Sequence, residues 1–384
     1  MLCEKRTWTA DGGWVGRSPN LRDAGLVLYF GDREVLAEGS WLEDLHGTYP
    51  KACFIGCSTG GQIARNELLD GVLVAIAVRF AATRVSLADF EISGPADSRT
   101  AGEAIGQALA ADDLSGVFVL SDGLLVNGSS LVAGLGAVLG PSVPISGGLA
   151  GDGPHFKATT VGVGTDTPRE GRVAAVGFYG SAIRLGYGSG GGWESFGPSR
   201  LVTRSASNLL LQLDSISALD LYERYLGDEA SGLPGTGLHY PLRVWNPAKP
   251  QHDVVRTVLA VDRNAKTMTF AGDIPQGFNA QLMHGRFEEL VAAAAEAATH
   301  ASSSLPPTAE SRQQLAILVS CIGRRLAMGQ ATGDEIQAAT ARLPPGTMTT
   351  GFYSYGEVAP HRISGVCELH NQSMTVTVIS EAPG

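Results

Sequence analysis

The sequence predicts an α+β protein made of two mixed α/β halves with largely antiparallel sheets. In the first half, buried apolar runs alternate with segments of helical spacing. From residue 158 onward the apolar runs become shorter and follow one another at hairpin spacing, which is typical of antiparallel strands. A chain that alternates strands and helices and then adds a meander favours this class over a doubly wound parallel sheet.

The first half supplies most of these elements. We expect strands where apolar residues run without interruption into turns, at 26–30, 52–55, 71–78 and 116–120. Apolar residues recur on one face at helical spacing over 100–111 and 127–139. The meander then adds short strands at 161–164, 172–179 and 183–188.

The second half follows a similar outline. We expect a glycine- and proline-rich loop at 227–237, helices at 287–301 and 333–343, and strands at 254–260, 267–271, 315–320, 349–355 and 374–379. Both halves contain a Gly-Phe-Tyr strand and a strand that runs into a cysteine, so a duplicated architecture is compatible with the sequence. The predicted domains are 25–216 and 217–380.

Composition narrows the function classes. The chain has 384 residues, of which 44% are hydrophobic, so it can bury a real core and is not a disordered chain. It carries 38 acidic and 28 basic residues, a net charge of −10, which disfavours nucleic acid and anionic membranes as partners. No stretch reaches the roughly 18 apolar residues of a membrane span. The 5 cysteines are odd in number and form no disulfide framework, so we expect a cytoplasmic protein.

One motif raises the possibility of an enzyme. The segment Gly56-Cys57-Ser58-Thr59-Gly60 matches the G-x-S-x-G turn of serine hydrolases, so a hydrolase using Ser58 or Cys57 is one alternative. That turn requires a helix directly after it, and the pair Gly60-Gly61 is a poor helix start. We therefore prefer to interpret this segment as a glycine-rich turn that lines a pocket.

Other features point to binding. The glycine-rich segment 147–153 can present backbone N–H groups to an anionic ligand, although turns between strands explain such a segment equally well. Cys321 ends an apolar strand and precedes Arg324, and Glu357 ends another strand. An Arg–Glu pair either stabilises the fold or orients a zwitterionic ligand. The 8 histidines show no zinc-site spacing, so we do not expect a structural zinc site.

Five segments, in order along the chain, resemble the motifs of the FIST sensory domain family. They span about residues 25–380, and Ser373 stands where the family motif has threonine. The segments are Gly56-Cys57-Ser58-Thr59-Gly60-Gly61, Ser146-Gly147-Gly148-Leu149-Ala150-Gly151-Asp152, Ser320-Cys321-Ile322-Gly323-Arg324, Gly351-Phe352-Tyr353-Ser354-Tyr355-Gly356-Glu357 and Glu368-Leu369-His370-Asn371-Gln372-Ser373-Met374-Thr375.

The resemblance implies a stand-alone cytoplasmic sensor that binds a small ligand and catalyses nothing. Its partner would be a histidine kinase or a cyclic-di-GMP enzyme, and a homodimer is compatible with this role. The ligand-binding candidates are Cys57, Ser58, Thr59, Gly147, Gly148, Asp152, Cys321, Arg324 and Glu357.

The same resemblance implies a more specific alternative, a haem-based nitric oxide sensor of the NosP group, with haem b as its cofactor. Such a haem needs an axial ligand, most commonly histidine. His370 is the first candidate because it lies in a family motif, followed by His239 and His155. The plain structural role for His370 is a hydrogen bond that holds the C-terminal strand.

Overall fold

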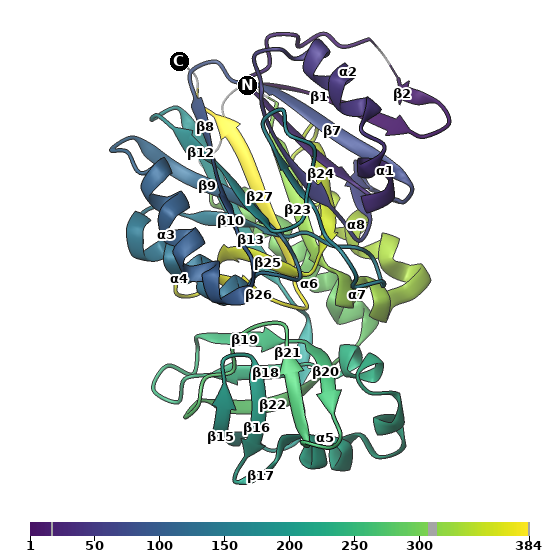
Figure 1. The fold of residues 1–384 in the computed structure, drawn as a ribbon, viewed down its shortest axis with the longest axis vertical. Coiled ribbons are helices and arrows are strands. Elements are labelled where there is room, and N and C mark those ends of the chain that lie inside the picture. Colours follow the sequence, from purple (N-terminus) through teal and green to yellow (C-terminus); the bar gives the residue numbers. More distant parts are fainter. Residues whose placement is uncertain (17, 306–312, 383–384) are drawn as a thin grey trace.

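The structure, a computed structural model, describes residues 1–382 except 17 and 306–312, and it divides into two bodies along its longest axis (Figure 1). We call the larger one the body; it comprises the described residues of the ranges 1–190 and 287–382. We call the smaller one the inserted domain; it comprises residues 193–285. Helices lie outside mixed and antiparallel sheets, which confirms the predicted α+β class.

The body contains three units with the same strand order. Each unit has a parallel pair of strands followed, on the side of the first strand, by two more strands, each antiparallel to its neighbour. In the first unit these are β3 (Leu26–Gly31), β4 (Cys53–Ser58), β7 (Val72–Arg79) and β1 (Leu2–Thr9). In the second they are β9 (Leu114–Ser121), β10 (Ile145–Leu149), β12 (Arg172–Tyr179) and β8 (Arg84–Glu91). In the third they are β23 (Leu315–Cys321), β24 (Met348–Ser354), β27 (Met374–Glu381) and β13 (Ile183–Gly190).

The three sheets exchange strands in a cycle. Beside the second parallel strand, each sheet continues with a strand from another unit: β11 (Val161–Val163) beside β4, β25 (Gly356–Pro360) beside β10, and β5 (Gln62–Ala64) beside β24. Three edge strands complete the sheets: β2 (Gly13–Val15), β6 (Glu67–Leu69) and β26 (Cys367–His370). In space the repeat is therefore threefold, one unit more than the duplication that the sequence suggested.

Helices cover the outer faces of the sheets. They are α1 (Arg33–Ala37) and α2 (Ser40–Thr48) in the first unit, α3 (Ser98–Leu109) and α4 (Gly128–Leu139) in the second, and α6 (Phe287–Ser303), α7 (Ile322–Met328) and α8 (Thr332–Thr340) in the third. Asn127 determines where α4 begins, because its side chain accepts a hydrogen bond from the backbone N–H of Ser130 at 3.0 Å. None of the helices in the described residues is long and apolar enough to cross a membrane.

The inner faces of the three sheets share one apolar core. Phe30 of the first unit stacks on Phe352 of the third, with ring centroids 4.7 Å apart. Phe118 of the second unit belongs to the same buried cluster. Because every unit contributes to this core, the units depend on one another for the burial of their apolar faces.

A ring of backbone hydrogen bonds closes the body where the second parallel strands end. The N–H of Gly60 donates to Tyr353 O at 2.7 Å, the N–H of Gly151 to Ser58 O at 2.9 Å, and the N–H of Tyr355 to Leu149 O at 3.2 Å. Each bond joins one unit to the next in the same relative position. The ring therefore brings the FIST-like motif segments of all three units to one end of the body.

A glycine occupies the equivalent position in each second parallel strand. An added Cβ would lie 2.2 Å from Tyr29 O at Gly56, 1.8 Å from Val119 O at Gly147 and 1.9 Å from Leu318 O at Gly351. These distances are far below van der Waals contact, so only glycine allows the two parallel strands to approach this closely.

The inserted domain has its own sheet and its own core. Its strands are β14 (Trp193–Ser195), β15 (Arg200–Ala206), β16 (Leu209–Leu213), β17 (Ile216–Ser217), β18 (Leu242–Trp245), β19 (Asp253–Arg256), β20 (Val258–Asp262), β21 (Thr267–Phe270) and β22 (Asn279–Gly285), and its helix is α5 (Ala218–Leu226). The predicted loop at 227–237 forms two 3₁₀ turns, Gly227–Gly232 and Gly235–His239. The chain enters at β14 and leaves at β22, two paired strands, so both crossings lie side by side; we call these two crossings the hinge.

The predicted division at 216/217 falls between strands of the inserted domain, because β16 pairs with both β17 and β21. The domain boundary at 216/217 stays a prediction. In space, two chain segments form the body, and the third unit contains the inserted domain between β13 and α6.

Candidate functional site

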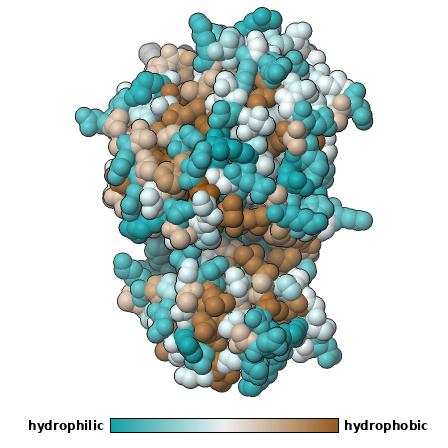
Figure 2. All heavy atoms as spheres, in the orientation of Figure 1, coloured by the Kyte–Doolittle hydropathy of each residue, from teal (hydrophilic) through white to brown (hydrophobic). Residues whose placement is uncertain are grey.

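The cleft between the body and the inserted domain contains cavities on several sides. We call one of them, with a volume of about 460 Å³, the cleft cavity. The body contributes Leu124, Leu149, Phe156, Cys321, Gly323 and Tyr355 to its lining, and the inserted domain contributes Leu238, Thr257, Val258, Leu259 and Phe270. Hydrophobic residues reach the surface at this waist (Figure 2).

The position of the cleft cavity follows from the topology of the body. Parallel strands end at the same edge, so Cys321 at the end of β23 lies beside Ser354 at the end of β24. Tyr355 follows Ser354 and belongs to the backbone ring, and its aromatic ring stacks on Phe156 with centroids 4.5 Å apart. One wall of the cavity is therefore built by motif segments that lie far apart in the sequence.

Most residues that line the cleft cavity are apolar. Among the described residues, the Thr257 hydroxyl has no hydrogen-bond partner although the residue is buried. Burial raises the pKa of the Cys321 thiol, and the carboxyl group of Glu357 adds to this effect, so the thiol is neutral. A ligand here would meet mainly apolar walls, the neutral thiol of Cys321 and the polar residues Asn127, Ser207 and Asn208.

Glu357 lies behind this wall, fully buried. Its carboxyl group accepts hydrogen bonds from the hydroxyl groups of Ser354 and Ser373, both at 2.8 Å. Burial is the largest influence and raises the pKa of Glu357 from 4.5 to about 8. The side chain is therefore largely protonated near neutral pH.

Replacing Glu357 with glutamine should flatten the pH dependence of stability. Between about pH 4.5 and about pH 8 the folded protein keeps a proton that the unfolded chain releases. The stability that this proton confers is fully present below about pH 4.5 and is lost as the pH rises through about 8, at a rate of at most about 1.4 kcal/mol per unit. Urea unfolding over this range measures the effect.

The matched control for this experiment is Glu103→Gln, because Glu103 lies on the exposed face of α3 and pairs only with Arg99 in the described residues. We expect the wild-type protein to lose stability relative to Glu357→Gln as the pH rises, but not relative to the control. A constant difference between wild type and Glu357→Gln would contradict the raised pKa.

Arg324 is buried and satisfied by the protein itself. Its guanidinium pairs with Glu335 at 2.7 Å and donates to the backbone oxygens of Gly191, Leu290 and Gln372. With the second bond to Glu335, from Nε, all five guanidinium donors are used. Arg324 thus holds the hinge residue Gly191 against the body; its predicted contact with a ligand stays a prediction.

The other predicted ligand-binding residues lie in or next to the ends of β4 and β10, apart from the cleft cavity. Cys57 is buried in the common core, and the Ser58 hydroxyl accepts a hydrogen bond from Thr160 N at 2.9 Å. Thr59 accepts one from the Gln62 amide at 2.7 Å. Asp152 accepts one from Arg33 at 3.1 Å. Gly147 and Gly148 lie within β10. Of the nine ligand-binding candidates, only Cys321 lines the cleft cavity.

Neither candidate nucleophile of the hydrolase alternative has a catalytic environment in the described structure. Ser58 and Cys57 are both fully buried, and burial raises the pKa of the Cys57 thiol well above its usual value. The partner of Ser58 is a backbone N–H, whereas a catalytic serine requires a neighbouring base.

The predicted haem ligands do not fit that cofactor. His155 and His239 are exposed, and neither lines one of the three cleft cavities described here. His370 is buried, but it lines a cavity of only about 300 Å³ and its Nε2 bonds to Ala359 O at 3.1 Å. This bond matches the plain structural role of His370.

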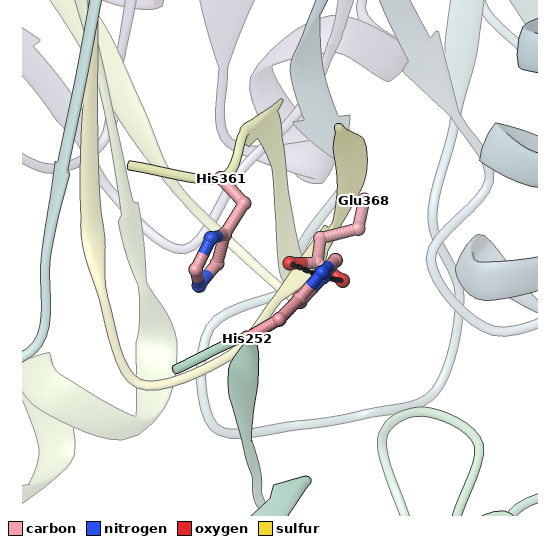
Figure 3. Close-up of side chains that lie close together, drawn as sticks. All are labelled: His252, His361 and Glu368. Atoms are coloured by element: carbon pink, nitrogen blue, oxygen red, sulfur yellow. Dashed lines mark hydrogen bonds and ion pairs between the residues drawn. The ribbon is translucent and has the colours of Figure 1, made fainter. Parts of the chain in front are cut away.

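Three polar features of the cleft were not among the sequence-based predictions. The side chains of His252, His361 and Glu368 meet there although they come from three separate segments (Figure 3). The amide of Asn371 lines the 300 Å³ cavity, and neither its nitrogen nor its oxygen has a partner in the described residues. Thr257 belongs to the inserted domain, which no motif marks. Of these residues, Glu368 and Asn371 lie in a segment that resembles a FIST motif, and this resemblance is the sequence signal that could have pointed to them.

Comparison with known proteins gives a family and a distant structural match. A family model described as the FIST N domain matches residues 25–216, and one described as the FIST C domain matches residues 218–360. A search of curated proteins finds no match. Among solved structures, a cyanuric acid hydrolase from A. caulinodans matches with a TM-score of 0.39 and 8% identity, covering 100% of this chain and 99% of that one.

Proposed function

The chain belongs to the FIST family of sensory domains in signal-transduction proteins, and on this premise we propose that it senses a small, largely apolar molecule held in the cleft cavity. The observation that carries the proposal is a cavity of about 460 Å³ with walls from both bodies. That volume lies within the range of roughly 300–1,000 Å³ of small-molecule sites, which are common at domain interfaces.

Exposed apolar side chains gather at the cleft. Five of the ten large apolar side chains that are exposed in the described residues line one of its cavities: Leu124, Phe156, Leu259, Ile363 and Val366. Such a concentration is typical of a binding surface, whereas single exposed apolar residues need no explanation. An apolar ligand would cover Leu124, Phe156 and Leu259 together.

A ligand in the cleft cavity would contact both bodies and so favour the closed arrangement about the hinge. It shifts the population only as far as its affinities for the open and closed arrangements differ. We propose that a separate cytoplasmic partner, a histidine kinase or a cyclic-di-GMP enzyme, binds one of these arrangements. The role is binding and not catalysis.

Replacing Leu259 with arginine should abolish most of this binding. The guanidinium would enter an apolar cavity, and its desolvation should weaken ligand affinity at least about tenfold. Leu201→Arg is the matched control, because Leu201 is 43% exposed and Leu259 is 45% exposed in the same domain, but Leu201 lies outside the cleft cavity. Thermal stabilisation by a panel of branched-chain and aromatic metabolites finds the ligand, and titration of both variants tests the site.

Two outcomes would contradict the proposal. The first is that no compound in the panel stabilises the wild-type protein. The second is that a stabilising compound binds Leu259→Arg and Leu201→Arg equally well. Anilinonaphthalene sulfonate, a dye that becomes fluorescent in apolar surroundings, offers a ligand-independent measure of the same cavity.

A further inference from the structure

Two histidines and one carboxylate converge at the cleft, apart from the cleft cavity. One ligand-type atom from each of His252, His361 and Glu368 lies within 4.8 Å of the other two. The Nε2 of His252 lies 3.1 Å from both carboxylate oxygens of Glu368, and its ring stacks on that of His361 with centroids 4.6 Å apart. Figure 3 shows the three side chains grouped together.

The three residues belong to both bodies. His252 precedes β19 in the inserted domain, whereas His361 and Glu368 lie at the end of β25 and in β26 of the body. His252 and Glu368 line a cavity of about 530 Å³, and His361 lines the cavity of about 300 Å³. Ions can therefore reach the group from the cleft.

We propose that His252, His361 and Glu368 bind a divalent transition-metal ion of the zinc class, and that this ion fastens the inserted domain to the body. Two imidazoles and one carboxylate are a common three-ligand set for zinc, and they leave a fourth position open. With bonds of roughly 2.0–2.1 Å, tetrahedral ligand atoms lie about 3.3 Å apart. The separation of His252 from Glu368 is already close to this value.

To bind a metal ion, the ring of His361 would have to turn, because it now stacks on the ring of His252 at an interplanar angle of 21° and a metal ion must lie in the plane of each imidazole that binds it. The Nε2 of His361 bonds to Asp253 O at 3.2 Å, and its Nδ1 is 3.3 Å from the backbone nitrogens of Ile363 and Ser364. These are long hydrogen bonds, which a metal bond readily replaces. A ring that binds metal through Nδ1 would keep the bond to Asp253 O, which is the usual way in which such rings are oriented.

Charged groups around His252, His361 and Glu368 influence how strongly these three residues would bind a metal ion. The buried Arg256 interacts electrostatically with Glu368 and opposes a second positive charge. Its guanidinium is bound to the backbone oxygens of Leu369 and Asp273 and does not compete for the carboxylate of Glu368. The carboxylate of Asp253 is held by Arg243 at 2.8 Å and is not available as a further ligand.

The metal site and the cleft cavity share no residue. Because the ion would bond to both bodies, it should restrict the hinge whether or not that cavity is filled. Failure of the metal experiment would leave the proposed sensing of an apolar molecule untouched, and the reverse also holds.

The test uses the full chain without an affinity tag, stripped of metal with a chelator and titrated with zinc chloride or cobalt chloride alone. We expect one zinc ion per chain, a rise in melting temperature, and the visible absorption of four-coordinate cobalt without sulfur bands. His252→Ala and Glu368→Gln should each weaken zinc binding at least about 100-fold. His300→Ala, an exposed histidine on α6, should leave it unchanged.

A hydrogen-bonded His252–Glu368 pair without metal affinity is the competing interpretation. It predicts that zinc binds weakly and that His252→Ala, Glu368→Gln and His300→Ala have the same effect; that result would overturn the proposal. Glu368→Gln preserves the shape of the side chain, and circular dichroism of each variant separates lost metal binding from lost folding.

Discussion

Replacing Gly147 with alanine is expected to destabilise the protein by more than about 4 kcal/mol, enough to prevent folding at moderate temperature. The new Cβ would lie 1.8 Å from Val119 O, an atom of the neighbouring backbone that cannot move aside. The residue also has φ +140°, which side chains rarely adopt. The free energy of unfolding, measured in urea by circular dichroism, tests this prediction.

The matched control is Gly136→Ala in α4 of the same unit, where an added Cβ meets nothing within 4 Å. Alanine in a helix interior is favoured over glycine by about 1 kcal/mol, so the control should be neutral or stabilised. A Gly147→Ala protein within about 1 kcal/mol of wild type would show that the close approach of the parallel strands is not a requirement of the fold.

The local elements of the body could be predicted because their signals are local. The apolar run at 26–30 became β3, the helical spacing at 100–111 became α3, and that at 287–301 became α6. The predicted strand at 254–260 was wrong in one respect. The run breaks at Thr257 into β19 and β20, which lie at opposite ends of the sheet of the inserted domain. One apolar run therefore forms two strands, of which β19 pairs with β18 and β20 pairs with β21.

The arrangement of these elements could not be predicted in the same way. The threefold repeat depends on strands such as β5, which leaves its own unit to pair with β24 almost 300 residues later. Hydrophobic spacing reports that a strand is buried, and not which strand lies beside it. The recurring glycine at 56, 147 and 351 was the one sequence signal of this repeat, and the high glycine content of the chain obscured it.

The candidate site shows the same limit. Cys321 was predicted from a motif and lines the cleft cavity, because the end of a parallel strand is a common place for a ligand. The neighbouring Arg324 and Glu357 lie behind that wall, where other residues of the protein take up their hydrogen bonds. His252 and Glu368 are 116 positions apart, so no spacing rule could have paired them.

Replacing Arg324 with alanine is the second change with a large expected effect. It removes the guanidinium that pairs with the buried Glu335 at 2.7 Å and leaves that carboxylate, among the described residues, with the hydroxyl groups of Ser320 and Tyr353. Breaking a fully buried ion pair in this way destabilises a protein by about 3–5 kcal/mol. The corresponding control is Arg99→Ala, whose exposed pair with Glu103 on α3 should contribute at most about 0.5 kcal/mol.

A double-mutant cycle separates the pair from its surroundings. If most of the loss comes from an unpaired buried charge, Arg324→Met combined with Glu335→Met should be less destabilising than the sum of the two single changes. Additive effects would mean instead that the carbonyl bonds of Arg324 to Gly191, Leu290 and Gln372 dominate. Those bonds hold the hinge, so hydrogen exchange at 190–193 should rise in every variant that lacks Arg324 but not in Glu335→Gln. This difference in hydrogen exchange would distinguish an arginine that positions the inserted domain from one that only fills the core.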